Sequence, residues 1–240
     1  MQILRATVWI YKIALQRSWQ CVRKNWIVSL APLAYGIILA VIATLIAPFG
    51  IFGGLLLSLA GQACVSSGLF LIKNLVENNR ADFNDFLHGF TVFLWELLAI
   101  AFILWIPLRV IAMGLDGIPN GALIYFLLKL VLYIVLNPVP EFIYQTRASG
   151  LELITASYGF IVENWIEWLV PNIALVAAGY FLLQLLEPLF YGFSGLLSLL
   201  VYAVAAGLAL TYLMTFRGFL FAQLYGTTRR SRLYRYKAHG

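Results

Sequence analysis

Long apolar runs alternate along this chain with short polar segments. Six of the runs carry few charges and have roughly the length of a bilayer-crossing helix, about 20 residues. The predicted spans are residues 26–48, 51–72, 91–110, 122–136, 165–186 and 194–216. The pattern therefore predicts an all-α fold, a polytopic membrane bundle of six transmembrane helices within one domain (residues 1–228), followed by a basic tail (residues 229–240).

Two further segments, residues 4–24 and 141–163, have helical periodicity but contain many polar residues. Their apolar side chains recur every three or four positions, with charged residues between them. Such helices lie in the membrane interface, where cations attract anionic lipid. For residues 4–24 the alternative is packing on the cytoplasmic ends of the bundle, and the two arrangements are compatible. We predict two amphipathic helices on the cytoplasmic face.

Each amphipathic helix and the span that follows it share a short pattern. Ser18, Asn25, Trp26 and Pro32 recur with the same spacing as Ser157, Asn164, Trp165 and Pro171. Trp anchors at the interface, and Asn satisfies backbone groups where a helix bends, so each Asn-Trp pair is predicted to join a surface helix to a span. The prolines are expected to kink the spans. Since four spans separate the copies, this is a parallel internal repeat, unlike the inverted repeats of many transporters.

The composition excludes a soluble domain and orients the chain in the membrane. The mean hydropathy is +0.90, and a soluble fold of this size could not bury so much apolar surface. Every Lys and Arg except Arg109 and Lys129 falls on the side of the termini, which the positive-inside rule makes cytoplasmic. We predict a location in the inner (plasma) membrane. The first residues have no continuous apolar centre, so no cleavable signal is predicted.

The basic residues near the membrane surface are predicted to contact lipid. Arg17, Arg23, Lys24, Arg229 and Arg230 are the expected contacts with anionic headgroups. A basic tail is also found in nucleic-acid-binding proteins, but beside a span it satisfies the positive-inside rule. We therefore predict no nucleic-acid partner.

Small residues form a stripe on the second predicted span. Gly54, Ser58, Gly61 and Gly68 lie on one face of residues 51–72. Small residues at helical spacing let helices approach closely in lipid, so the stripe predicts helix packing. A ligand groove is the alternative.

Glu96 and Lys129 are charged residues inside predicted spans. A charge within the bilayer is costly and normally finds a partner in the bundle interior, so we predict an intramembrane pair. Its role is either structural or that of a proton or ion relay. Arg109 and Asp116, at the outer loop, are expected to form a local ion pair.

The remaining polar residues suggest no metal or cofactor site. Glu141, Glu152, Glu163 and Glu167 are too dispersed along the second surface segment to converge on a metal, and we expect them to pair with the first helix or the basic tail. Cys21 lies on a surface helix and Cys64 within a span, so no disulfide is predicted.

Sequence motifs for catalysis are missing: the chain has no zinc-protease motif, nucleophile elbow, Walker loop or dinucleotide fingerprint. His88, with Asp82 and Asp85, is the one combination that suggests a polar cleft. We predict that the protein is not an enzyme.

Two short motifs carry a family resemblance. Pro140-Glu141 is followed by Gly150, Ser157 and Asn164 before a span, and Asp85-Phe86-Leu87-His88-Gly89-Phe90 precedes the third span. These resemble patterns in uncharacterised prokaryotic six-helix membrane proteins, the YciC-like group and the membrane domain that accompanies some glycerophosphodiester phosphodiesterases. The resemblance implies a compact bundle with two amphipathic helices on the cytoplasmic face, and it carries over no catalytic residue.

Three classes of function follow from these observations. The first is a non-catalytic scaffold, accessory subunit or envelope factor that binds lipid or a membrane protein partner, including a second copy of itself. The alternative is a transporter of a small molecule, ion or lipid that uses Glu96 and Lys129. The third is a lipid-modifying enzyme built on His88, Asp82 and Asp85.

Overall fold

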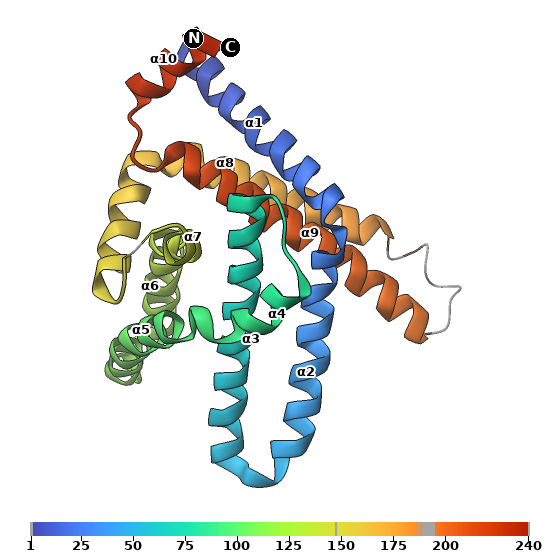
Figure 1. The fold of residues 1–240 in the computed structure, drawn as a ribbon. Helices are drawn as coiled ribbons and strands as arrows, with labels where there is room; N and C mark the ends of the chain where they lie inside the picture. Colours follow the sequence, from blue (N-terminus) through green and yellow to red (C-terminus); the bar gives the residue numbers. More distant parts are fainter. Residues whose placement is uncertain (1, 147, 187, 189–194, 240) are drawn as a thin grey trace.

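The computed structural model describes residues 2–146, 148–186, 188 and 195–239, and these residues form helices joined by short connections, without a strand (Figure 1). The predicted all-α class is therefore confirmed. The helices are α1 (Gln2–Lys24), α2 (Ala31–Ile46), α3 (Gly50–Asn78), α4 (Phe83–Val92), α5 (Leu94–Leu115), α6 (Gly121–Val135), α7 (Val139–Gln145), α8 (Leu151–Leu186), α9 (Gly195–Leu224) and α10 (Arg229–His239), with 3-10 turns at η1 (Trp26–Leu30) and η2 (Ala47–Phe49).

Within the described residues, five helical segments are long and apolar enough to cross a membrane. They are Trp26–Asn78, Leu94–Leu115, Gly121–Gln145, Leu151–Leu186 and Leu197–Leu224. Large apolar side chains on these helices are exposed, including Ile51, Trp95 and Phe181. Apolar surface on this scale is unfavourable in water and favourable in lipid, as expected of a multi-pass membrane protein.

The first of these segments contains a helical hairpin. Pro48 lies in η2, and Gly50 has a positive φ (+55°) that a residue with a Cβ rarely takes. Figure 1 shows α2 descending to this turn and α3 returning beside it. The chain therefore reverses direction at Pro48, Phe49 and Gly50, between the predicted spans 26–48 and 51–72.

Helix α4 packs closely on α3 and fixes where α5 begins. A Cβ at Gly89 would lie 2.8 Å from the Ser67 Cα, so only glycine allows this approach. Ser66 Oγ donates to the Gly89 carbonyl and accepts the Phe93 N–H, at 2.6 and 2.9 Å. Since Phe93 leaves the helical conformation to make this bond, α5 begins at Leu94, three residues later than the predicted span.

An aromatic core lies where α7, α8 and α9 meet. Phe142 packs edge-on against Phe221, with ring centroids 4.8 Å apart, and Phe160 packs edge-on against Trp168 at 5.3 Å. Such pairs are stabilised beyond their area burial. A Cβ at Gly218 would lie 2.6 Å from both Val76 and the Tyr144 hydroxyl, so α9 also touches α3 and α7 there.

The predicted packing stripe on α3 is wrong for most of its length. Gly54 and Ser58 are exposed, and a Cβ at Gly54 or Gly61 would meet no atom within 4 Å. Only Gly68 approaches a neighbour, at 3.7 Å from Tyr35. Gly61 and Gly68 instead line a groove together with residues of α2 and α9, whereas the close contact of α3 with α4 lies at Ser66 and Ser67.

The predicted surface helix 141–163 is also wrong as one continuous helix. Helix α7 ends at Gln145, Thr146 is extended, and Gly150 has a φ of +56° before α8 begins at Leu151. Arg147, which contributed to the predicted charge asymmetry, and Ser194, at the start of the sixth predicted span, lie outside the described residues. The sixth predicted span otherwise continues to Leu224, well beyond residue 216.

The basic tail forms α10, which packs against α1 at the two ends of the chain (Figure 1). Trp9 and Tyr236 meet edge-on with centroids 6.0 Å apart. Helix α1 turns its small residues Ala6, Ala14 and Ser18 inward, while Val8 and Trp19 are exposed. The N- and C-terminal helices are therefore parts of one packed unit.

Candidate functional site

A buried ion pair joins α9 to α7. Arg217 is the one charged residue of α9, and its Nε and Nη2 donate to Oε1 and Oε2 of Glu141 at 2.7 and 2.8 Å. The Glu141 side chain is 0% exposed and that of Arg217 12%. A bidentate pair of this kind offsets much of the cost of removing two charges from water.

Asn137 and Trp168 complete this cluster, which we call the Arg217 centre (Asn137, Glu141, Trp168 and Arg217). Arg217 also donates to the Asn137 carbonyl at 2.7 Å and to Asn137 Oδ1 at 3.2 Å. Trp168 Nε1 donates to the same Oδ1 at 2.8 Å, and the guanidinium lies 5.1 Å from the Trp168 ring centroid. The centre thus ties the α6–α7 connection, α7, α8 and α9 together.

A second polar cluster stabilises a kink in α8, and we call it the Asn164 hinge (Asn164, Glu167, Arg229 and Arg232). Asn164 has non-helical angles (φ −128°, ψ 19°). Its Nδ2 donates to the Phe160 carbonyl at 3.2 Å, and its Oδ1 accepts from Arg232 Nη2 at 2.7 Å. Glu167 pairs with Arg229 at 2.8 Å, so α10 contributes both cations.

The electrostatics of the Asn164 hinge extend to α1. Burial, together with the Glu167 carboxylate, raises the pKa of Tyr11 to about 12, against a smaller lowering effect of Arg232. Burial also lowers the pKa of Arg232, which Glu167 partly opposes. Asn164, Glu167 and Arg232 of the hinge are therefore buried, Arg229 lies at its exposed edge, and Tyr11 of α1 is close enough to feel its charges.

Asn25 forms a bend with the same local geometry as Asn164. Its angles are φ −120° and ψ 38°, and its Nδ2 donates to the Cys21 carbonyl four residues earlier, at 2.9 Å. The adjacent Trp26 and Trp165 are 56% and 53% exposed. The predicted role of each Asn, to satisfy backbone groups at a bend, is confirmed.

The other residues of the predicted repeat are only partly alike. Ser18 and Ser157 are both fully buried. Pro32 lies at the start of α2, where its missing N–H leaves no bond unmade, whereas Pro171 lies inside α8. Pro32 therefore begins a helix and does not kink one.

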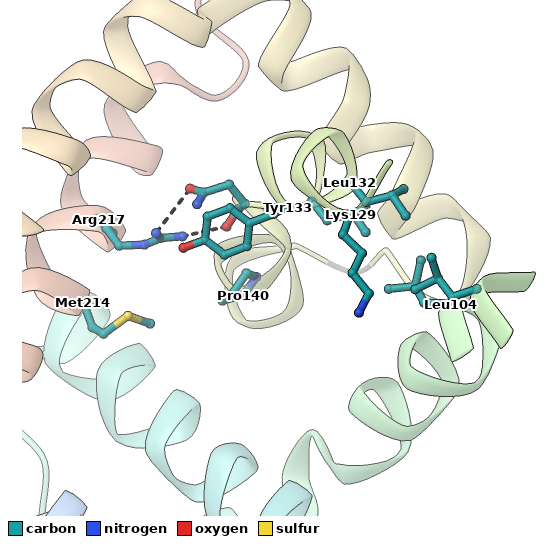
Figure 2. A pocket seen from close by; sticks show the side chains of 10 residues that line it. Leu104, Lys129, Leu132, Tyr133, Pro140, Met214 and Arg217 are labelled. Carbon is teal, nitrogen blue, oxygen red and sulfur yellow. Dashed lines mark hydrogen bonds between the residues drawn. The ribbon is translucent and has the colours of Figure 1, made fainter. Parts of the chain in front are cut away.

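A cavity of about 530 Å³ lies beside the Arg217 centre, and we call it the Lys129 cavity. Figure 2 shows Lys129 extending into the open space, with Arg217 across from it. The lining is mostly leucine and other apolar side chains from α5, α6, α7, α9 and the α6–α7 connection: Leu104, Leu108, Lys129, Leu132, Tyr133, Leu136, Asn137, Pro140, Met214 and Arg217.

The predicted pair of Glu96 and Lys129 is not formed: among the described residues, the ion pairs are Arg80–Asp82, Arg217–Glu141 and Arg229–Glu167. Because α5 begins at Leu94, Glu96 lies in its first turn, where the helix dipole favours a carboxylate. Lys129 is mid-helix, and its Nζ lies 4.4 Å from the Tyr125 ring centroid. The same three pairs leave no local pair between Arg109 and Asp116.

Asp82, Asp85 and His88 do not form a reaction centre. Asp82 and Asp85 are the two halves of a capping box at the start of α4, in which the Asp82 N–H donates to Asp85 Oδ2 at 2.8 Å. Arg80 pairs with Asp82, and the His88 ring packs against Phe70 with centroids 5.9 Å apart. No group of three His, Cys, Asp or Glu residues suited to a metal is found in the described part of the chain.

Most of the predicted headgroup-contacting cations are available on the surface. Arg17, Arg23, Lys24 and Arg230 are exposed, and Arg17 and Lys24 line a polar groove between α1 and α3. Arg229 differs, because it pairs with Glu167. That pair confirms the expectation that a glutamate of this segment meets the basic tail.

Sequence reasoning missed the roles of Asn137, Trp168, Arg217 and Arg232. Arg217 carried one signal, because it interrupts an apolar helix and a charge there needs a partner. Its distance of 76 positions from Glu141 left the partner undetermined. The buried Arg232 had no signal, since it lies among exposed arginines of a basic segment.

The sequence matches no family model, and the comparisons with curated proteins and with solved structures found no match either.

Proposed function

We propose that this chain is a six-span protein of the plasma membrane, with both termini in the cytoplasm and a parallel repeat of two hinged helices. Division of the 53-residue segment Trp26–Asn78 at the Gly50 turn supports a count of six. The like bends at Asn25 and Asn164 support the repeat. The exposed Val8 and Trp19 support an α1 that contacts lipid while it packs on α9.

Reporter fusions test this topology. With six spans, a reporter after residue 240 and one before residue 1 have the same cytoplasmic orientation. A reporter inserted at Gly117, in the loop between α5 and α6, has the opposite orientation. The measurement is alkaline phosphatase activity against fluorescent-protein emission for each fusion. Termini on opposite sides of the membrane would exclude a count of six.

Its function, we propose, is that of a non-catalytic scaffold or accessory protein that binds membrane lipid. The observation that carries this proposal is that, among the described residues, most buried charges are paired with one another, whereas the charge of Lys129 is not. Within the Arg217 centre and within the Asn164 hinge, the charged side chains form ion pairs that hold helices together. The Lys129 cavity, by contrast, is largely apolar and presents a cation. A cavity of this character favours an anionic amphiphile over reaction chemistry.

The resemblance to the YciC-like group agrees with this proposal and adds the expectation of a compact bundle. The transporter alternative has less support. It used Glu96 and Lys129 together, and of the two only Lys129 lines a cavity.

Extraction with native lipid tests the proposed function. The full chain is released from its membrane in polymer nanodiscs, and the retained lipids are quantified by mass spectrometry. We expect anionic lipid to be enriched over the bulk membrane by roughly five-fold, which is the preference that about 1 kcal/mol of attraction between one cation and an anionic headgroup gives. A six-span membrane protein without cationic cavities, extracted in parallel, is the control. A lipid composition equal to that of the bulk membrane would refute lipid binding.

A further inference from the structure

We propose that the Lys129 cavity is the binding site for the headgroup of one anionic glycerophospholipid. This inference rests on the proposed lipid-binding function and names its site and ligand. Lys129 would contact the phosphodiester, and the leucines of α5 and α6 would contact the first methylene groups.

The charge of the cavity favours an anionic ligand. Lys129 is exposed on an apolar helix, and its Nζ lies 4.4 Å from the centroid of the Tyr125 ring. The charge of the other cation, Arg217, is matched by Glu141 at 2.7 Å. The cavity therefore presents one positive charge that no described acidic residue neutralises. A singly anionic ligand is its electrostatic complement, and pairing relieves the cost of a lone cation in lipid.

The shape and lining of the cavity favour a lipid over a free ion. The volume of about 530 Å³ holds a headgroup and the start of two chains but not a whole phospholipid. The remaining chain length has a path outward, since Lys129 and Tyr133 are both exposed. Leu104, Leu108 and Leu132 provide an apolar wall that suits methylene groups and disfavours free inorganic phosphate.

The polar groups at the rim favour a phosphodiester. In Figure 2 the Tyr133 ring lies between Lys129 and Arg217, and its hydroxyl points towards Arg217. An ammonium and a hydroxyl together suit the two anionic oxygens of a phosphodiester. A fatty-acid carboxylate has similar chemistry, so the experiment compares the two directly.

Native mass spectrometry of the detergent-purified full chain tests the proposal. Wild-type protein is titrated with dioleoyl phosphatidylglycerol, dioleoyl phosphatidylcholine and oleate. We expect one phosphatidylglycerol to bind at least about five-fold more tightly than either other lipid. Lys129→Met should remove this preference, and Lys129→Arg should keep it. Arg109→Gln, which removes an exposed cation of α5 outside the lining, should behave as wild type.

A second variant distinguishes loss of the binding site from misfolding of the chain. Leu132→Trp narrows the cavity without changing its charge, so it should weaken phosphatidylglycerol binding in protein that elutes as wild type on size exclusion. Unchanged binding in both Lys129→Met and Leu132→Trp would overturn the site while lipid binding stands. Equal binding of oleate or phosphatidylcholine would overturn the ligand. A wild-type chain that retains no lipid would refute the proposed function as well.

Discussion

Replacement of Glu141 by Leu is expected to be the most destabilising single change in the Arg217 centre. The change leaves the Arg217 guanidinium, whose side chain is only 12% exposed, without its counter-charge. Stranding one partner of a buried pair costs about 3–5 kcal/mol. The free energy of unfolding, measured by titration with SDS in mixed micelles, should fall by that amount. Glu163→Leu, at an exposed glutamate of α8, is the matched control and should cost under about 1 kcal/mol.

The double variant Glu141→Leu, Arg217→Met separates the charge from the packing. Removing both charges leaves no stranded ion, so the double variant should be more stable than Glu141→Leu alone. Trp168 still donates to Asn137 in that variant, which keeps one bond of the centre. Strictly additive effects, or a single-variant cost no larger than that of Glu163→Leu, would show that the pair does not stabilise the fold.

The apolar runs were enough to predict most of the helices. The predicted span 122–136 matches α6 (Gly121–Val135), and the predicted end at residue 186 matches the end of α8. A bilayer requires each span to be continuous, apolar and about 20 residues long, so these boundaries are written locally in the sequence. Gly150 is also a local signal of a break, but the helical spacing of apolar residues across 141–163 conceals it.

Helix rotation and partner choice were not predictable in the same way. In α8 the apolar Leu151 and Tyr158 are exposed, whereas Ser157 and Asn164 are buried. In lipid an apolar side chain gains little by facing the protein, and small or polar residues mediate helix contacts instead. The hydrophobic stripe therefore did not identify the packing face. The Glu96–Lys129 prediction failed for a related reason, because it depended on where α5 begins.

Arg232 is a buried residue whose role has no local signal in the sequence. It is 6% exposed although it belongs to the basic C-terminal segment, and it donates to Asn164 across 68 positions of sequence. Nothing local distinguishes it from Arg230, which is exposed. Only the packing of α10 on α1 places one arginine at the kink of α8 and its neighbour in solvent.

Arg232→Met is expected to loosen the kink of α8 and release α10. The substitution replaces the guanidinium side chain by an unbranched apolar one, and it leaves the buried Asn164 Oδ1 without its donor. A hydrogen bond to a charged group contributes about 1.5–3 kcal/mol, and the free energy of unfolding should fall by about that much. Hydrogen exchange should speed up at the backbone amides of residues 160–167 and of α10, because both sides of the contact open together.

Arg230→Met is the matched control, because it removes the same charge from the same helix at an exposed position. It should leave the exchange of residues 160–167 unchanged. Since both variants lower the net charge equally, a difference between them reports the Arg232–Asn164 contact and not a general loss of attraction to anionic detergent or lipid. Equal exchange in the two variants would mean that the kink is held by the Asn164–Phe160 bond and the helix packing alone.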